Sequence, residues 1–272
     1  MLSVLFQYQF LQNAVWAGLL ASIVCGIIGV IIVEKKLVMM SGGIAHTSYG
    51  GIGLGYLLGF EPIIGAFSVA VLAALGIGYI KRKGDSRTDV IIGLFWSLGM
   101  ALGILFISLL PGYPPEMSSY LFGNILAVTR SDLRLIFILA LVVVSLVIIL
   151  FDYWKSYLFD EEFATILGIK TAFLEYLLFI LIALAVVVLI RVVGIILVLA
   201  LFTAPTAVAT LFTKDLRIRM ILSIILGSAF CLSGLWLSYE FNIASGASIV
   251  ILSSLGYLIA YIASRNKIIK SN

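Results

Sequence analysis

The chain has 272 residues, of which 63% are hydrophobic and only 11% are charged. A soluble domain carries about 25% charged residues, so this composition excludes a soluble globular protein and indicates a polytopic protein surrounded by membrane lipid. The net charge of +4 does not indicate nucleic-acid binding, because the basic residues form short clusters between apolar runs rather than a stripe with interleaved aromatic residues.

A transmembrane helix needs about 20 mostly apolar residues. On this rule the sequence predicts an all-α fold of about nine membrane spans, which form one transmembrane domain over residues 1–272. The expected spans are 13–33, 38–59, 62–80, 89–110, 133–151, 172–190, 194–213, 218–238 and 245–263. Residues 191–193 alone separate the sixth and seventh spans, which predicts either a tight hairpin there or that one of the two spans is not a full crossing.

Basic residues favour the cytoplasmic side of a membrane. If the N-terminus lies outside and the C-terminus lies in the cytoplasm, fourteen of the seventeen lysines and arginines fall inside, and only Arg130, Arg134 and Arg191 fall outside. The opposite orientation of a nine-span chain reverses this bias. We therefore predict an external N-terminus and a cytoplasmic C-terminus; an even number of spans would move one of them.

The second span contains the stretch SGGIAHTSYGGIGLG at 41–55, which has six glycines and His46, the only histidine of the chain. Small side chains let two helices approach closely in a bilayer. An ionisable residue inside a span is a candidate functional residue. We interpret His46 as a candidate for contact with a substrate. The alternative is a packing helix whose histidine is hydrogen-bonded to a neighbour.

The inside segment 152–171 predicts a short amphipathic helix at about 159–168. Apolar residues recur there at helical spacing: Phe159, Phe163, Ile166 and Leu167. Acidic residues suit the start of a helix, and three of them lie there: Asp160, Glu161 and Glu162. Gly168 is suited to end the helix. Interfacial helices favour lysine and arginine, so this acidic helix fits a protein partner better than a lipid surface.

The seventh span carries Pro205 in its interior, where proline kinks a helix. Thr203 and Thr206 flank it, and we expect them to satisfy the backbone carbonyls that the proline frees. Kinked spans often line a transport pathway. A simple packing kink is the alternative, and the residue pattern alone favours it.

Several sequence motifs of enzymes are absent. The chain has no G-x-x-x-x-G-K-[ST] loop for ATP, no HExxH and no GxSxG. Cys25 and Cys231 lie far apart in apolar runs and form no CxxC pair. One histidine does not make a zinc site of the usual kind. We therefore predict a transport protein with weak, transient sites rather than an enzyme, and no cofactor bound by this chain.

Four stretches together resemble the sequence pattern of one family. The stretch 41–55 resembles G-D-A-L-S-H-A-x-x-P-G-x-A-x-G, and YLFGNILAV at 120–128 resembles L-F-G-x-I-L-x-V. GIILVLALFTAPTAVA at 194–209 resembles G-x-L-L-V-x-A-L-L-x-x-P-A-A-x-A, and NIASGASIV at 242–250 resembles D-x-P-x-G-A-x-I-V. Because the four occur in the family's order along nearly the whole chain, the protein resembles the permease subunit of bacterial ABC-type importers for zinc, manganese or iron(II).

The resemblance implies a pair of permeases, expected to be a homodimer, in a bacterial or archaeal plasma membrane. It implies two copies of a separate ABC ATPase beneath them and an extracytoplasmic metal-binding protein or lipoprotein above. A divalent metal ion would be the transported substrate, contacted by His46, with Gly42, Pro205 and Asn242 as pathway-lining candidates. The helix at 159–168 would be the coupling helix that docks on the ATPase, through Asp160, Glu161, Glu162, Ala164 and Gly168.

The sequence departs from the family pattern at four positions. Gly42 and Asn242 stand where the pattern has aspartate, and Gly50 and Ala244 stand where it has proline. The loss of two carboxylates leaves fewer hard oxygen ligands, so the identity of the metal stays open. A permease of the same fold for a small organic solute and a stand-alone secondary transporter are the alternatives.

Overall fold

A computed structural model describes residues 8–83, 88–112 and 118–270. These residues form helices and connecting loops without any strand, which confirms the predicted all-α class. The helices are α2 (Gln9–Glu34), α3 (Val38–Leu58), α4 (Pro62–Arg82), α5 (Thr88–Ser108), α6 (Ser118–Phe122), the 3-10 turn η1 (Ile125–Ala127), α7 (Arg130–Ile149), α8 (Phe151–Phe159), α9 (Glu161–Ile166), α10 (Thr171–Phe212), α11 (Leu216–Phe241) and α12 (Ser245–Lys270).

Within the described ranges, seven helices are long and apolar enough to cross a membrane: α2, α4, α5, α7, α10, α11 and α12. Helix α3, with 21 residues, is long enough to cross a membrane but is not among these seven. Its glycines, serines and histidine lower its hydropathy below that of the seven helices. Helix α10 counts once here, although we expected two spans in the same stretch. The nine predicted spans differ from these seven helices only at α3 and α10, and the number of crossings stays a prediction.

Helix α10 has 42 residues, about 63 Å at 1.5 Å per residue, which is twice the thickness of a bilayer core. The backbone of Gly194 is not helical (φ 79°, ψ 160°) and breaks the helix there. Before the break, Glu175 pairs with Lys81 at the end of α4, whereas Arg191 pairs with Glu61 just before the start of α4. The first half of α10 therefore runs antiparallel to α4.

The second half of α10 returns to the end of the molecule from which the first half started. Arg219 donates a hydrogen bond to the carbonyl of Lys214, just after α10, and pairs with Glu34 at the end of α2. The next residue, Lys35, pairs with Glu161 of α9. Both termini of α10 thus lie at the α9 end, and Gly194 lies at the opposite end. The hairpin predicted at 191–193 is wrong in detail, because those residues stay helical and Gly194 alone reverses the chain.

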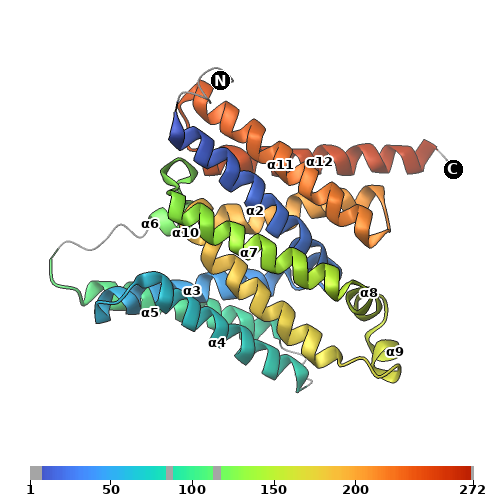
Figure 1. The fold of residues 1–272 in the computed structure, drawn as a ribbon, viewed down its shortest axis with the longest axis horizontal. Helices are drawn as coiled ribbons and strands as arrows, with labels where there is room; N and C mark the ends of the chain where they lie inside the picture. The colour runs from blue at the N-terminus through green and yellow to red at the C-terminus, as the bar shows by residue number, and fades with distance from the viewer. Residues whose placement is uncertain (1–7, 84–87, 113–117, 271–272) are drawn as a thin grey trace.

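Helix α10 is central to the helix bundle and packs against α2, α3, α4, α7, α11 and α12. In Figure 1, α3, α4 and α5 lie on one side of α10, and α2, α11 and α12 lie on the other. Helix α10 is largely buried, whereas α5 and α12 are mostly exposed and apolar. Exposed apolar helix faces are what a lipid environment requires, and the protein is accordingly a multi-pass membrane protein.

Gly123 and Gly194 bring two distant segments into backbone contact. Both have positive φ angles, 68° and 79°, and a Cβ atom added to either would overlap the backbone of the other. At Gly246, an added Cβ would lie 2.8 Å from the carbonyl oxygen of Phe122. Three of the four stretches that resemble the family pattern, 120–128, 194–209 and 242–250, therefore meet at the reversal of α10.

The helix predicted at 159–168 is wrong in extent, because two short helices share that segment. Phe159 ends α8, and α9 begins at Glu161. Between them the backbone of Asp160 is extended (φ −153°, ψ 108°), and its carboxylate accepts a 2.9 Å hydrogen bond from the backbone N–H of Phe163. Asp160 therefore caps α9, a role that suits its short acidic side chain.

The end of α9 is as predicted. Gly168 has a φ of 82°. The N–H of Gly168 donates to the carbonyl of Thr165 and the N–H of Ile169 donates to the carbonyl of Ala164, both at 3.0 Å. These two bonds form the usual glycine-terminated helix end, which explains why a residue without a side chain stands here.

We predict that Gly194→Ala destabilises the protein by at least about 2 kcal/mol, because alanine adds both left-handed strain and a backbone clash. Gly59→Ala is the matched control, since Gly59 has a φ of 73° but no atom within 4 Å of an added Cβ. Thermal unfolding midpoints in detergent measure the difference. Equal shifts for the two variants would contradict the contact between Gly123 and Gly194.

Candidate functional site

Helices α3 and α5 touch through their backbones at glycines. A Cβ added at Gly50 would lie 2.8 Å from the carbonyl oxygen of Gly99, and one at Gly53 would lie 2.6 Å from that of Gly103. The glycines of α3 therefore serve close helix packing, as the sequence predicts. The facing motif on α5, Gly99-x-x-x-Gly103, is visible in the sequence and is the signal that identifies α5 as the partner helix.

His46 lies on this tightly packed helix and stacks on Trp96 of α5. The two ring centroids are 4.0 Å apart and the ring planes differ by 9°. His46 is half-buried. Its Nδ1 atom is buried and has no hydrogen-bond partner within the described part of the chain. An unpaired buried polar atom costs about 1–3 kcal/mol, so this histidine is not explained by a hydrogen bond from Nδ1 to a neighbour. Sequence reasoning did not identify Trp96.

Gly42 lies one helical turn before His46 and contacts the same tryptophan. A Cβ added at Gly42 would lie 3.3 Å from Cζ3 of Trp96 and 3.8 Å from Cδ1 of Leu199 in α10. Trp96 and Leu199 therefore occupy the space that a larger side chain at this position would need. Of the predicted site residues, the structure brings Gly42 and His46 together.

Pro205 and Asn242 lie elsewhere in the fold. Pro205 is buried towards α11, where a Cβ added at Gly227 would lie 3.6 Å from its Cγ. Asn242 is exposed and ends α11 in the left-handed conformation, φ 56°, which asparagine tolerates well. No contact seen in the described ranges joins either residue to His46, and their roles in a pathway stay predictions.

The threonines beside Pro205 do not act as expected. Proline at position 205 frees the carbonyl of Leu201, four residues earlier. The hydroxyl of Thr203 instead donates to the carbonyl of Leu199 at 2.8 Å, and the hydroxyl of Thr206 pairs with that of Ser223 of α11 at 2.9 Å. The expectation fails because one hydroxyl bonds to an earlier carbonyl and the other joins two helices.

The residues around His46 do not form a binding site for a resident metal ion. Across the described ranges, no three histidine, cysteine, aspartate or glutamate side chains gather where they could hold one. One imidazole provides a single metal ligand, whereas structural and catalytic zinc sites take three or four protein ligands. A single copy of the chain therefore supplies one candidate metal ligand at this position.

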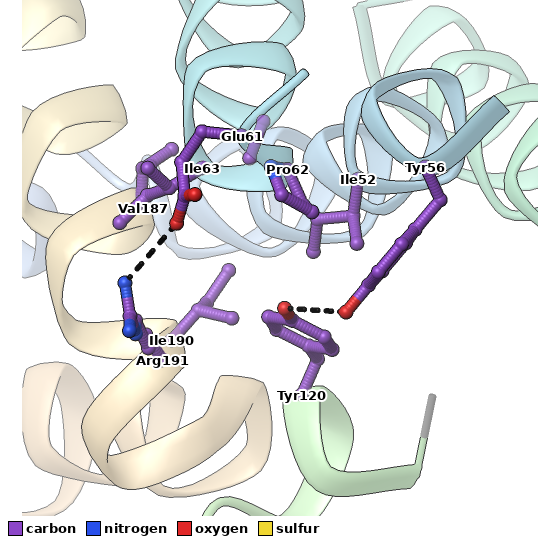
Figure 2. Close-up of a pocket in the computed structure, with 10 residues that line it drawn as sticks. Ile52, Tyr56, Glu61, Pro62, Ile63, Tyr120, Val187, Ile190 and Arg191 are labelled. Atoms are coloured by element: carbon purple, nitrogen blue, oxygen red, sulfur yellow. Dashed lines mark hydrogen bonds and ion pairs between the residues drawn. The ribbon is translucent and has the colours of Figure 1, made fainter. Parts of the chain in front are cut away.

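A separate cavity of about 300 Å³ opens at the Gly194 end and is lined by residues of α3, α4, α10 and α6 (Figure 2). The guanidinium of Arg191 lies 3.6 Å from the carboxylate of Glu61, and the hydroxyls of Tyr56 and Tyr120 lie 3.3 Å apart. Arg191 also lies 3.4 Å from Asp132 at the start of α7. No residue of α5 lines this cavity, so it is distinct from the stack of His46 on Trp96.

The predicted coupling residues lie around α9 at the other end. Glu162 and Gly168 are exposed, and Asp160 is exposed while its carboxylate caps α9. Ala164, in the middle of α9, is fully buried, and the carboxylate of Glu161 lies 2.7 Å from the ammonium group of Lys35. Ala164 and Glu161 therefore hold α9 against the rest of this chain. Four large apolar side chains around α9 are exposed: Phe159, Phe163, Ile166 and Leu167.

We predict that Gly99→Ala loosens the packing of α3 on α5 and costs about 1–3 kcal/mol, because the new methyl group would meet the backbone of Thr47. Gly93→Ala, in the same helix, is the control, since no atom lies within 4 Å of an added Cβ there. Thermal unfolding of both variants in detergent checks this. A Gly99→Ala variant as stable as Gly93→Ala would contradict the close approach.

Comparisons with a family sequence model and with related sequences match this chain to transport proteins, and a solved structure matches it over nearly its whole length. The sequence model of the ABC 3 transport family matches residues 7–264. The chain is 36% identical over 258 residues to the manganese transport system membrane protein MntC of Listeria monocytogenes, covering 95% of this chain and 92% of the relative. It is 34% identical over 267 residues to the manganese import system permease protein ScaB of Streptococcus gordonii, covering 98% and 96%. In the solved structure of PsaBC from Streptococcus pneumoniae in complex with Fab, a chain with 33% identity superposes with a TM-score of 0.85, covering 96% of this chain and 94% of that one.

Proposed function

The chain belongs to the ABC 3 transport family, and we propose that it is the permease subunit of an importer that moves manganese, zinc or iron(II) into the cell. Such a subunit is a multi-pass protein of the plasma membrane. The observation that supports the cargo most is the full-length similarity to relatives named as manganese transport permeases. In this proposal a separate ATPase chain hydrolyses ATP, and the present chain does not.

We propose nine membrane crossings, with α3 counted as a span and α10 counted as two. The ion pairs of Glu175 with Lys81 and of Arg191 with Glu61 support the division of α10, because they show that its first half alone extends from one end of α4 to the other. The clustering of basic residues near α9 supports a cytoplasmic location for that end. The cavity beside Arg191 is then extracytoplasmic.

His46 is the proposed contact for the metal ion. Neutral imidazole is a common ligand for transition metals. Because one chain supplies a single histidine, we infer that a second permease copy supplies another from the opposite side of the path. As a ligand, imidazole suits zinc or iron better than manganese, which prefers carboxylate, carbonyl and water oxygens. Measuring the uptake of each metal in competition with the other two distinguishes these three cargoes. Gly42, Pro205 and Asn242 remain candidates for lining the path.

The ATPase partner is proposed to dock on α9. Phe159 is 92% exposed and Ile166 is 81% exposed, next to the acidic residues at the start of the helix. A cluster of exposed apolar side chains beside charged ones typically marks a protein interface. Closure of the ATPase pair on ATP would push on α9 and tilt the spans, so that access to the path alternates between the two sides.

We predict that His46→Ala lowers metal uptake about tenfold, the scale of effect seen when a metal-supporting residue is lost, and changes the order of preference among metals. The measurement is ATP-dependent uptake by proteoliposomes that contain the permease, its ATPase and its metal-binding protein. Thr47→Val is the control, because the hydroxyl of Thr47 bonds within α3 to the carbonyl of Gly43. Lower thermal stability with unchanged uptake and preference would assign His46 to packing instead.

We predict that Gly168→Trp assembles normally but lowers the metal imported per ATP hydrolysed, because the indole projects from the end of the docking helix. The space around Gly168 is open, with no atom within 4 Å of an added Cβ. Gly168→Ala carries the same left-handed strain without the bulk and should stay close to the unsubstituted protein. Normal import by the tryptophan variant would argue against docking at α9.

A further inference from the structure

Lys35 joins three elements at the α9 end of the molecule. Its ammonium group lies 2.7 Å from the carboxylate of Glu161 in α9 and 3.6 Å from the ring centroid of Tyr157 in α8. The side chain of Lys35 is only 15% exposed. The side chain of Glu161 is 40% exposed, so only the lysine of this pair is largely screened from water. A buried ammonium group that lies over an aromatic ring still makes the pair stronger than one between two fully exposed side chains.

The segment that carries Lys35 is a tight corner between α2 and α3. Lys35 is the C-cap residue of α2, and Lys36 adopts the left-handed conformation with φ 57°. The N–H of Leu37 donates a 2.8 Å hydrogen bond to the carbonyl of Ile32, which closes the corner. Helix α3 starts at the next residue, so His46 lies about 12 Å along α3 from its start.

Helix α9 has few other attachments. It has six residues, too few to be stable alone. Its one buried residue is Ala164, and it packs against α8 and α10, including a 3.1 Å contact between the hydroxyls of Thr165 and Thr171. The pair of Lys35 with Glu161 is the side-chain link from α9 to α2 in the described part of the chain.

The neighbouring cations are already engaged by another carboxylate. Lys81 and Arg82 of α4 lie 2.5 and 2.7 Å from the carboxylate of Glu175, which is 3% exposed. Together with Glu161 these three residues line a cavity of about 250 Å³ between α9 and the helix ends. Lys35 is thus the cation that the structure pairs with Glu161, whereas the two cations that line the cavity pair with Glu175.

We propose that Lys35 is a positioning residue for coupling: through Glu161 it holds α9 against the α2–α3 corner, so that a movement of α9 is passed directly to the helix that carries His46. This inference rests on the proposed function, because it assigns α9 to the ATPase contact. It goes further by naming the intramolecular link through which that contact reaches the metal path.

The test compares Lys35→Met, Lys35→Arg and the charge exchange Lys35→Glu with Glu161→Lys, each reconstituted with the ATPase and the metal-binding protein. We expect Lys35→Met to lower metal uptake about three- to fivefold while ATP hydrolysis stays within about twofold. Lys35→Arg should keep most of the uptake, and the double exchange should recover part of what each single reversal loses. Lys83→Met is the control: Lys83 is exposed and lies 4.6 Å from the ring centroid of Tyr79, but it pairs with no carboxylate among the described residues.

Hydrogen–deuterium exchange of the α9 backbone amides provides a second readout that does not depend on the cargo. We expect Lys35→Met to speed exchange in α9 and Lys83→Met to leave it unchanged. The proposal is overturned if Lys35→Met keeps both its uptake-to-hydrolysis ratio and its α9 exchange rates. It is also overturned if uptake, hydrolysis and thermal midpoint all fall together. If the unsubstituted complex imports none of the three metals, the proposed function fails, and the exchange result alone decides whether Lys35 positions α9.

Discussion

Backbone contact at glycines is the constraint on which this structure depends. Lipid provides no hydrophobic force between helices, so stable association needs close, well-fitted approach. Gly50 against Gly99 brings α3 onto α5, and that approach sets His46 on Trp96. Gly123 against Gly194 permits the reversal that turns one 42-residue helix into two antiparallel halves. Larger residues at these positions would separate the elements that form both the core and the candidate site.

The same packing gives the molecule two different ends with α3 between them. At one end, the corner before α3 is linked to α9 by Lys35 and Glu161. At the other end, Tyr56 of α3 lines the cavity that also contains Glu61 and Arg191. A displacement of α3 would therefore act on both ends at once and on the histidine between them. Under the proposed function, an ATPase docked at the α9 end could control access to the cavity at the other end through such a displacement.

The sequence predicts well those features that depend on composition and local spacing. The all-α class, the close packing of the glycine stretch and the end of α9 at Gly168 are examples. It fails at Asp160, where the helical spacing of apolar residues continues from Phe159 and hides the break between α8 and α9. At Gly194 a break is expected from the sequence, but its position is shifted from 191–193 to the next residue. The sequence also does not predict that His46 stacks on Trp96 or that Lys35 pairs with Glu161. These contacts depend on how distant segments pack together, and residue spacing alone carries no information on such pairs.

Uptake by the reconstituted, unsubstituted complex tests the central claim most directly. The permease, its ATPase and its extracytoplasmic binding protein would be placed in liposomes, and accumulation of manganese, zinc and iron(II) would be followed with ATP and with a non-hydrolysable analogue. The account predicts accumulation of at least one of these metals that requires both ATP hydrolysis and the ATPase chain. Accumulation of no metal with ATP present, or equal metal uptake by the permease alone, would contradict it.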